Sequence, residues 1–168
     1  QVFGKEPLNV NVVPVHDIVI RCLEETGSDA IVRAGQNGGY SRIYDEVDSI
    51  EGVPHYIIEG ESLILPLEKI ESEIGLVIIE ELSFCISDFR EIAQDYESIN
   101  HELRNAKVSV LDDVVNLKLD YPIKINKGDT TYELKDFSFS VRSRIDDYYK
   151  ISERTVVEQQ RHPGSICI

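Results

Sequence analysis

Apolar residues recur at helical spacing in three stretches of the chain. The first follows Pro14, a residue type well tolerated at the start of a helix, and ends before the glycines at 35, 38 and 39, which predicts a helix over residues 14–35. The second opens at Pro66 and runs to Leu82, with five glutamates expected mostly on its other sides. The third covers residues 146–160. The stripe of the first helix is Val15, Ile18, Val19, Cys22, Leu23, Thr26, Ala30, Ile31 and Ala34. The stripe of the second is Ile70, Ile74, Val77, Ile78 and Leu82, and its glutamates are Glu68, Glu71, Glu73, Glu80 and Glu81. The stripe of the third is Tyr149, Ile151, Val156 and Val157.

After residue 105 apolar and polar residues alternate along the chain, which indicates β-strands. Two strands are expected around Val108 to Val110 and Val114 to Tyr121, joined at residues 111–113. Residues 126–129 have the composition of a hairpin turn and lead into a return strand over 132–141. The pattern also predicts a hairpin of residues 40–44 with 56–58 and a short helix capped by Ser87 and Asp88. That helix continues through Phe89, Ile92 and Tyr96.

Helices followed by a meander and a last helix are the order of an α+β protein. The predicted fold is a single domain in which two or three helices pack on an antiparallel β-meander. We assign residues 1–13 to an extended lead-in, residues 14–161 to the domain and residues 162–168 to the start of a truncated C-terminal continuation. The chain opens with Gln1 rather than Met, so we expect it to be an excised domain with neighbours on both sides.

The composition is strongly acidic, with 31 Asp and Glu residues against 17 Lys and Arg and a net charge of −14 over 168 residues. Nucleic acids and anionic membrane surfaces are bound mainly through clustered Lys and Arg, so the charge argues against both as partners. A cationic ligand or a divalent ion is compatible with it, and simple solubility is the alternative explanation. No apolar stretch approaches the roughly 18 residues that span a bilayer, so we expect no membrane insertion by this segment.

Three cysteines stand at positions 22, 85 and 167. Cys22 lies on the stripe of the first helix and Cys85 continues the stripe of the second, so packing of the two helices would bring these positions together. A disulfide and two separate buried cysteines both fit that spacing. A Cys22–Cys85 bridge would leave Cys167 unpaired within this chain, either buried or with a partner beyond residue 168. No pair of cysteines has the spacing of a zinc site.

Motifs for catalysis are missing from the sequence. The glycine-rich residues 35–40 follow a helix, whereas phosphate-binding loops follow a strand and open a helix, so a helix cap and turn is the better interpretation. The histidines at 16, 55, 101 and 162 are widely separated, and adjacent acidic pairs on a helix do not face each other. Asp45, Glu46 and Asp48 suit weak calcium binding or a solvated loop. We therefore predict no catalytic residues, no cofactor and no metal site, and lean against an enzyme.

Several short segments resemble one family in the same order along the chain. They are IRCLEETG (20–27), QNGGY (36–40), EELSFCISDF (80–89), DYPIKI (120–125), KGD (127–129) and KDF (135–137). In these segments the chain resembles a group of archaeal membrane-anchored, extracytoplasmic proteins of uncharacterised function, in which a hydrophobic segment precedes the domain. The resemblance implies a tethered, outward-facing cell-surface domain in a compartment where Cys22 and Cys85 would oxidise. It implies no activity.

Three functions remain in competition at this point. The leading expectation is a non-catalytic structural or interaction domain with protein partners at the cell envelope, which offers an unpaired edge of the meander for strand addition. The first alternative is a ligand-binding or sensory domain, with Gly38, Gly39 and Tyr40 as a candidate binding loop. In that case Tyr40, Tyr44, His55, Tyr56 and the acidic residues 45–51 would line a pocket for a cationic or sugar-like ligand. The second alternative is a hydrolase whose carboxylates converge only in the fold.

Overall fold

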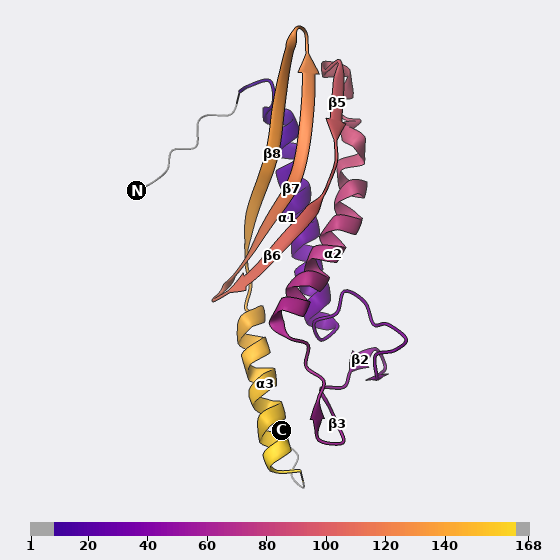
Figure 1. Ribbon diagram of the computed structural model, residues 1–168, viewed down its shortest axis with the longest axis vertical. Helices are drawn as coiled ribbons and strands as arrows, with labels where there is room; N and C mark the ends of the chain where they lie inside the picture. Colours follow the sequence, from indigo (N-terminus) through magenta and orange to yellow (C-terminus); the bar gives the residue numbers. More distant parts are fainter. Residues whose placement is uncertain (1–8, 164–168) are drawn as a thin grey trace, which may run out of the picture.

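The computed structural model describes residues 9–163, which form three long helices and a four-stranded antiparallel sheet. This arrangement confirms the predicted α+β class. Figure 1 shows α1 behind the sheet, α2 beside α1 along the β6 side, and α3 beyond one end of the sheet. The elements are α1 (Val13–Gln36), β1 (Ser49–Ile50), β2 (Val53–Pro54), β3 (Ile57–Ile58), β4 (Glu61–Ser62), α2 (Leu67–Ile86), η1 (Ser87–Phe89), η2 (Ala93–Asp95), β5 (Ser98–His101), β6 (Asn105–Leu111), β7 (Val114–Lys127), β8 (Thr130–Arg142) and α3 (Ile145–Arg161).

The helices begin and end close to the predicted positions, and their apolar stripes are buried in α1 and α2. Two expectations about side chains were wrong. Glu73, expected on an outer side of α2, is 2% exposed. On α3 only Val156 of the predicted stripe is fully buried, while Ile151 is 56% and Val157 is 42% exposed. Because α3 lies beyond the end of the sheet, it has little surface to pack against (Figure 1).

The sheet is organised around the long strand β7. β8 pairs with β7 along one edge, and β6 and β5 pair with the other edge one after the other. Two-residue turns join β6 to β7 and β7 to β8, since Leu111 pairs with Val114 and Lys127 pairs with Thr130. The predicted meander and its hairpin turn at residues 126–129 are therefore confirmed.

Pro122 lies in the middle of β7, where a residue without an N–H group would normally break the ladder. A register shift occurs there, because two residues of β7 face Lys135 alone on β8. On the other side β5 has ended and β6 has not begun, and the Pro122 carbonyl accepts a hydrogen bond from Glu102 N at 3.2 Å. The irregularity on both flanks explains why proline is tolerated in the central strand.

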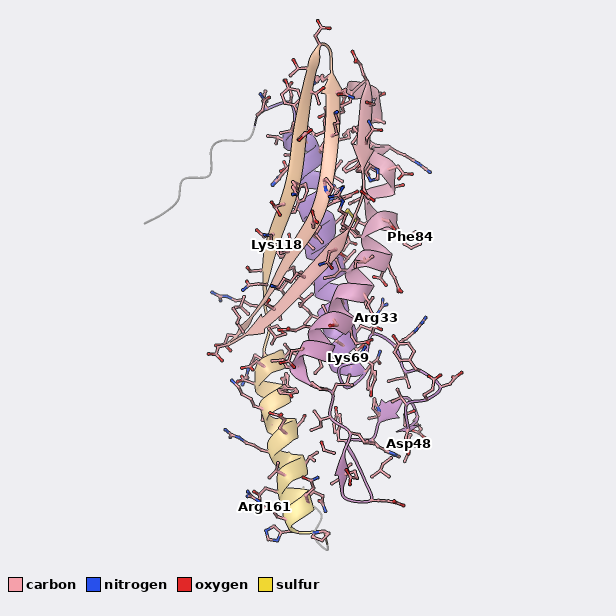
Figure 2. The ribbon with its side chains drawn as sticks, viewed as in Figure 1. Arg33, Asp48, Lys69, Phe84, Lys118 and Arg161 are labelled. Carbon is pink, nitrogen blue, oxygen red and sulfur yellow. A yellow bond between two sulfur atoms is a disulfide. The ribbon has the colours of Figure 1, made fainter. Side chains whose placement is uncertain are left out.

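One face of the sheet packs on α1 and α2 and the other is polar. The inward residues of β7 are all at most 2% exposed and form the centre of the core with the two helix stripes. The outward face is lined by polar side chains, among them the exposed Lys118 labelled in Figure 2. The inward residues of β7 are Val115, Leu117, Leu119, Tyr121, Ile123 and Ile125.

Two local predictions were wrong. Residues 40–44 form no strand; instead β1 pairs with β2 and β3 with β4, each hairpin closing through a Gly with positive φ (Gly52 and Gly60). No α-helix follows Ser87, because Ser87, Asp88 and Phe89 have left-handed φ values of 49°, 53° and 56°. This turn, which is η1, places Phe89 in the core, and one short 3₁₀ turn, η2, leads on to β5.

Candidate functional site

Cys22 and Cys85 form a disulfide that joins α1 to α2. The sulfur atoms are 2.10 Å apart and the Cα atoms 5.7 Å apart, which is within the usual range for a bridge. The predicted pair is thus confirmed, while Cys167 lies outside the described residues. The bridge ties the C-terminal end of α2 to α1.

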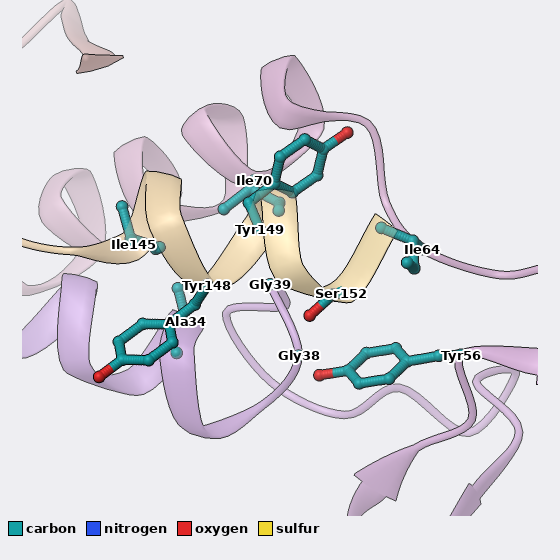
Figure 3. Close-up of a pocket in the computed structure, with 11 residues that line it drawn as sticks. Ala34, Gly38, Gly39, Tyr56, Ile64, Ile70, Ile145, Tyr148, Tyr149 and Ser152 are labelled. Carbon is teal, nitrogen blue, oxygen red and sulfur yellow. The ribbon is translucent and has the colours of Figure 1, made fainter. Parts of the chain in front are cut away.

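The loop with Gly38 and Gly39 has a conformation that needs glycine. Their φ values are +64° and +99°, and a Cβ atom at Gly39 would come within 2.8 Å of the Ile70 side chain. Gly39 N donates to Ala34 O at 2.7 Å, which closes the end of α1. Figure 3 shows the two glycines facing α3 across a small cavity of about 70 Å³ that is lined mainly by apolar groups and tyrosines. Tyr40 does not line this cavity. The three residues of the candidate binding loop therefore do not form one site, because Gly38 and Gly39 line this cavity and Tyr40 lines another.

A buried carboxylate holds the next part of this loop against α2. Glu73 Oε2 accepts hydrogen bonds from Ser41 N (3.0 Å), Ser41 Oγ (2.6 Å) and Tyr44 OH (3.3 Å), and Oε1 pairs with Lys69 Nζ at 3.0 Å. Burial raises the pKa of Glu73, but the bonds from Ser41 and the contact with Lys69 outweigh it, so its pKa lies below the usual value. The same contact raises the pKa of Lys69. The sequence carried a signal for this role, because position 73 falls among the buried positions 70, 74 and 77 of the helix.

Tyr40 lines a separate open hollow of about 450 Å³ above the two small hairpins. His55 lies at its wall, with its ring 3.5 Å from Asp48. Tyr44 and Tyr56, which were expected to line the same pocket, do not. The lining residues are Tyr40, Glu46, Val47, Asp48, His55, Ile58, Glu59, Glu61 and Leu63. The hollow therefore combines the Tyr40 ring, the His55 imidazole and apolar groups with four carboxylates.

His101 belongs to a cluster that the sequence did not reveal. Its Nδ1 is 2.9 Å from Tyr121 OH, its ring packs edge-on against Phe89, and its Nε2 is 3.7 Å from Asp88 Oδ1. Burial, followed by the charge of Asp88, raises the pKa of Tyr121, so its hydroxyl stays protonated. The cluster joins the left-handed turn at 87–89 to the irregular part of β7 and has a structural role.

The β6 edge of the sheet is closed by α2. Glu71 Oε1 accepts a hydrogen bond from Val110 N at 2.7 Å, which satisfies a backbone donor that points away from β7. Gly75 lies directly on the strand, since a Cβ atom there would come within 2.8 Å of Ala106 O. No other chain could pair with β6 at these positions.

The β8 edge is open along residues 136–142. The backbone N–H and C=O groups of Val110 point away from β7. In an antiparallel ladder the opposite residue, Val115, then points its backbone groups away from β6 and toward β8. There Val115 pairs with Val141, whose backbone groups therefore point toward β7. Backbone groups alternate along a strand, so those of Asp136, Ser138, Ser140 and Arg142 point outward. Within the described residues β8 pairs only with β7, and the edge forms the left border of the sheet in Figure 1.

Metal sites and membrane spans are not found within residues 9–163. No three His, Cys, Asp or Glu side chains of that range form a group suited to a metal ion, and Asp45, Glu46 and Asp48 are not such a group. None of the helices described is both long and apolar enough to cross a bilayer.

Comparison with known proteins gives no assignment. No protein-family model matches the chain, and no curated protein or solved structure shows significant similarity to it.

Proposed function

We propose that this chain is a non-catalytic interaction domain of a membrane-anchored surface protein, that it works outside the cytoplasm, and that it binds a protein partner by strand addition at β8. The observation that carries this proposal is the contrast between β6 and β8: α2 closes the outer side of β6, and nothing in residues 9–163 pairs with the outer side of β8. An exposed row of N–H and C=O groups is a ready template for another strand.

The location is supported by two arguments. The Cys22–Cys85 bridge is compatible with an oxidising compartment, where structural disulfides persist. The resemblance of the segments around residues 20–40, 80–89 and 120–137 to anchored extracytoplasmic proteins points the same way. Rapid acid quenching of intact cells followed by alkylation would test it: we expect Cys22 and Cys85 to be oxidised, and reduced thiols at both positions would contradict an external location.

Strand addition is tested by a matched pair of substitutions at Ser138. Ser138→Ala and Ser138→Pro both remove the hydroxyl, but only proline removes the outward N–H, and neither removes a donor used in the β7–β8 ladder. The two immobilised domains are exposed to the envelope fraction of the cells that produce the protein, and bound proteins are quantified by mass spectrometry. We expect a partner at least tenfold more abundant on Ser138→Ala, and equal recovery on both variants would reject the edge as the binding site.

A ligand-binding function is the second candidate, supported by the hollow of about 450 Å³ beside Tyr40. A cation with an apolar body would lie on the tyrosine ring with carboxylates around it. Arginine methyl ester is a suitable probe: we expect saturable chemical-shift changes at Tyr40 and His55 that disappear in Tyr40→Ala. Shifts that spread over the acidic surface without saturation would reject this function. The hydrolase alternative stays a prediction.

A further inference from the structure

We infer that the occupant of the open edge is a second copy of this chain, joined to β8 in an antiparallel pairing whose two-fold axis passes through Phe139. The inference rests on the proposed function, because it names the partner that uses the same edge.

Backbone geometry restricts how two copies of β8 can pair. The outward groups belong to Asp136, Ser138, Ser140 and Arg142, and the register shift at Lys135 limits the regular edge to residues 136–142. In the new ladder an outward-pointing residue of one copy must lie opposite an outward-pointing residue of the other. The outward residues of β8 are two positions apart, so this is possible only when the two-fold axis passes through a residue and not between two residues. With the axis at Phe139, Ser138 pairs with Ser140 of the second copy, and both pairs exchange hydrogen bonds.

Side-chain charge selects this register over its neighbours. With the axis at Phe139, Asp136 lies directly opposite Arg142 of the second copy, and the symmetry makes this contact twice. An axis one residue earlier places Asp136 opposite Ser140 and Arg142 opposite Leu134, so it forms no ion pair. An axis one residue later places Arg142 opposite Ser138 and Asp136 opposite Arg144, but Arg144 lies beyond the end of β8 and already pairs with Asp147 at 2.9 Å. Opposite charges in direct cross-strand positions stabilise a sheet, whereas like charges destabilise it.

Both charged groups are accessible for this contact. Asp136 is 62% exposed in its side chain and makes only a long contact of 3.7 Å with Lys118. Arg142 is exposed and has no ion pair among the described residues. On the inward side Phe139 and Val141 are only half-buried, and the second copy would place its own Phe139 and Phe137 beside them.

The distribution of charge along the chain also favours this edge. Residues 1–104 contain 21 acidic and 7 basic residues, whereas residues 105–168 contain 10 of each. The whole net charge of −14 therefore belongs to the part of the chain that precedes β6, which includes α1, the hairpin loop, α2 and β5. Two copies repel each other least when they approach through the neutral part, which includes β8.

Charge reversal tests both the partner and the register. Asp136→Arg places two arginines opposite each other in each contact, and Arg142→Asp places two aspartates there. An equimolar mixture of the two variants restores an Arg–Asp pair at both contacts, and so does the double variant D136R/R142D. All chains carry Cys167→Ser so that intermolecular disulfides are not counted, and association is measured by analytical ultracentrifugation from about 10 µM to 1 mM.

We expect a reversible dimer with a dissociation constant in the micromolar range or weaker, because a seven-residue ribbon forms an interface at the small end of the range. Each single variant should weaken it at least tenfold, and the mixture and the double variant should recover it to within about threefold. A chain that stays monomeric at 1 mM, or single variants that associate like the parent, would overturn the inference.

The outcomes separate this inference from the proposed function. One outcome is a monomeric chain for which Ser138→Ala captures an envelope protein and Ser138→Pro does not. Strand addition at β8 would then be supported, and the second copy would be the wrong partner. The two Ser138 variants are also compared in the same ultracentrifugation experiment. If they capture envelope proteins equally and also associate equally, the edge is not used and both proposals fail.

Discussion

The two edges of the sheet differ in how their backbone groups are treated. At β6 the side chain of Glu71 occupies the Val110 donor, and Gly75 brings α2 onto the strand at Ala106. At β8 the donors of residues 138, 140 and 142 point outward and pair with nothing that the structure describes. The chain thus blocks β6 with a helix and leaves the outer side of β8 available, which separates the strand that α2 holds from the strand that we propose as the binding edge.

The closed edge depends on the position of α2, which is fixed at two points. The disulfide ties its C-terminal end to α1, and Glu73 ties its N-terminal half to the loop at Ser41. Among residues 9–163 no comparable anchor crosses the outer side of β8. Substitutions on the α2 side should therefore cost stability, whereas substitutions on the outer side of β8 should change association.

The largest effect is expected from the disulfide. Replacing Cys22 and Cys85 together by alanine frees a loop with a sequence separation of 63 residues, and the chain-entropy description gives a loss of about 4 kcal/mol in the free energy of unfolding. Denaturant unfolding measures it. The parent chain in reductant is the control and should lose a similar amount; a loss below about 1 kcal/mol in both would show that α2 is held by packing alone.

Glu73 should have the next largest effect. Glu73→Ala removes a buried acceptor with three donors and leaves Lys69 without its partner, so we expect a loss of about 3 kcal/mol. Because the folded pKa lies below the unfolded value of 4.5, this contribution is present above about pH 4.5 and is lost as the pH falls through the folded pKa. Unfolding measured from pH 7 to pH 3 should show a steeper loss for the parent than for Glu73→Gln; parallel curves would contradict the assignment.

The sequence was sufficient to predict the helices and the meander, because both follow from the spacing at which apolar residues recur along the chain. Pro14 and Pro66 mark the starts of α1 and α2, and the alternation from residue 105 gives β6 to β8. Period does not reveal the loop between α1 and α2, where β-prone residues 40–44 are instead held by Glu73. Nor does it reveal the turn after α2, since Ser87, Asp88 and Phe89 adopt left-handed φ without a glycine among them.

The candidate site could be predicted only in part. An unpaired edge follows from a meander, but which edge is covered depends on where α2 crosses the sheet, and this is a tertiary contact. Glu71 looks like an ordinary exposed helical glutamate in the sequence. Gly75 was the available clue, since a glycine within an apolar helical stripe suggests close approach of another backbone.

Gly75→Ala tests the close contact of α2 with β6. The added Cβ would lie 2.8 Å from Ala106 O, a backbone atom that cannot move aside cheaply, so we expect a loss of about 2 kcal/mol. Gly35→Ala is the matched control, because nothing lies within 4 Å of its Cβ position in α1. That change should stabilise by about 0.5–1 kcal/mol through helix propensity. Equal effects of the two substitutions in thermal unfolding would contradict a close contact at Gly75.

Glu71→Ala should open the β6 edge at a smaller cost. It leaves the Val110 N–H without its acceptor, for an expected loss of about 1.5 kcal/mol, and Glu71→Gln should lose less because it retains an oxygen at the same place. Hydrogen exchange of the Val110 amide reports the same bond locally. Exchange at Val110 should become faster in Glu71→Ala and change little in Glu71→Gln, and unchanged protection in both would mean that the edge is closed by α2 as a whole.

Ser138→Pro should have the smallest effect on stability, below about 1 kcal/mol, because its N–H points away from β7 and proline is tolerated on such an edge. Phe139→Pro, one residue further along, removes a donor directed at Leu117 and should cost about 3 kcal/mol or more. The difference between these neighbours, measured by denaturant unfolding, checks the direction of every backbone group from residue 136 to residue 142. If both prolines are equally destabilising, the outward row on β8 does not exist, and the contrast between the two edges disappears with it.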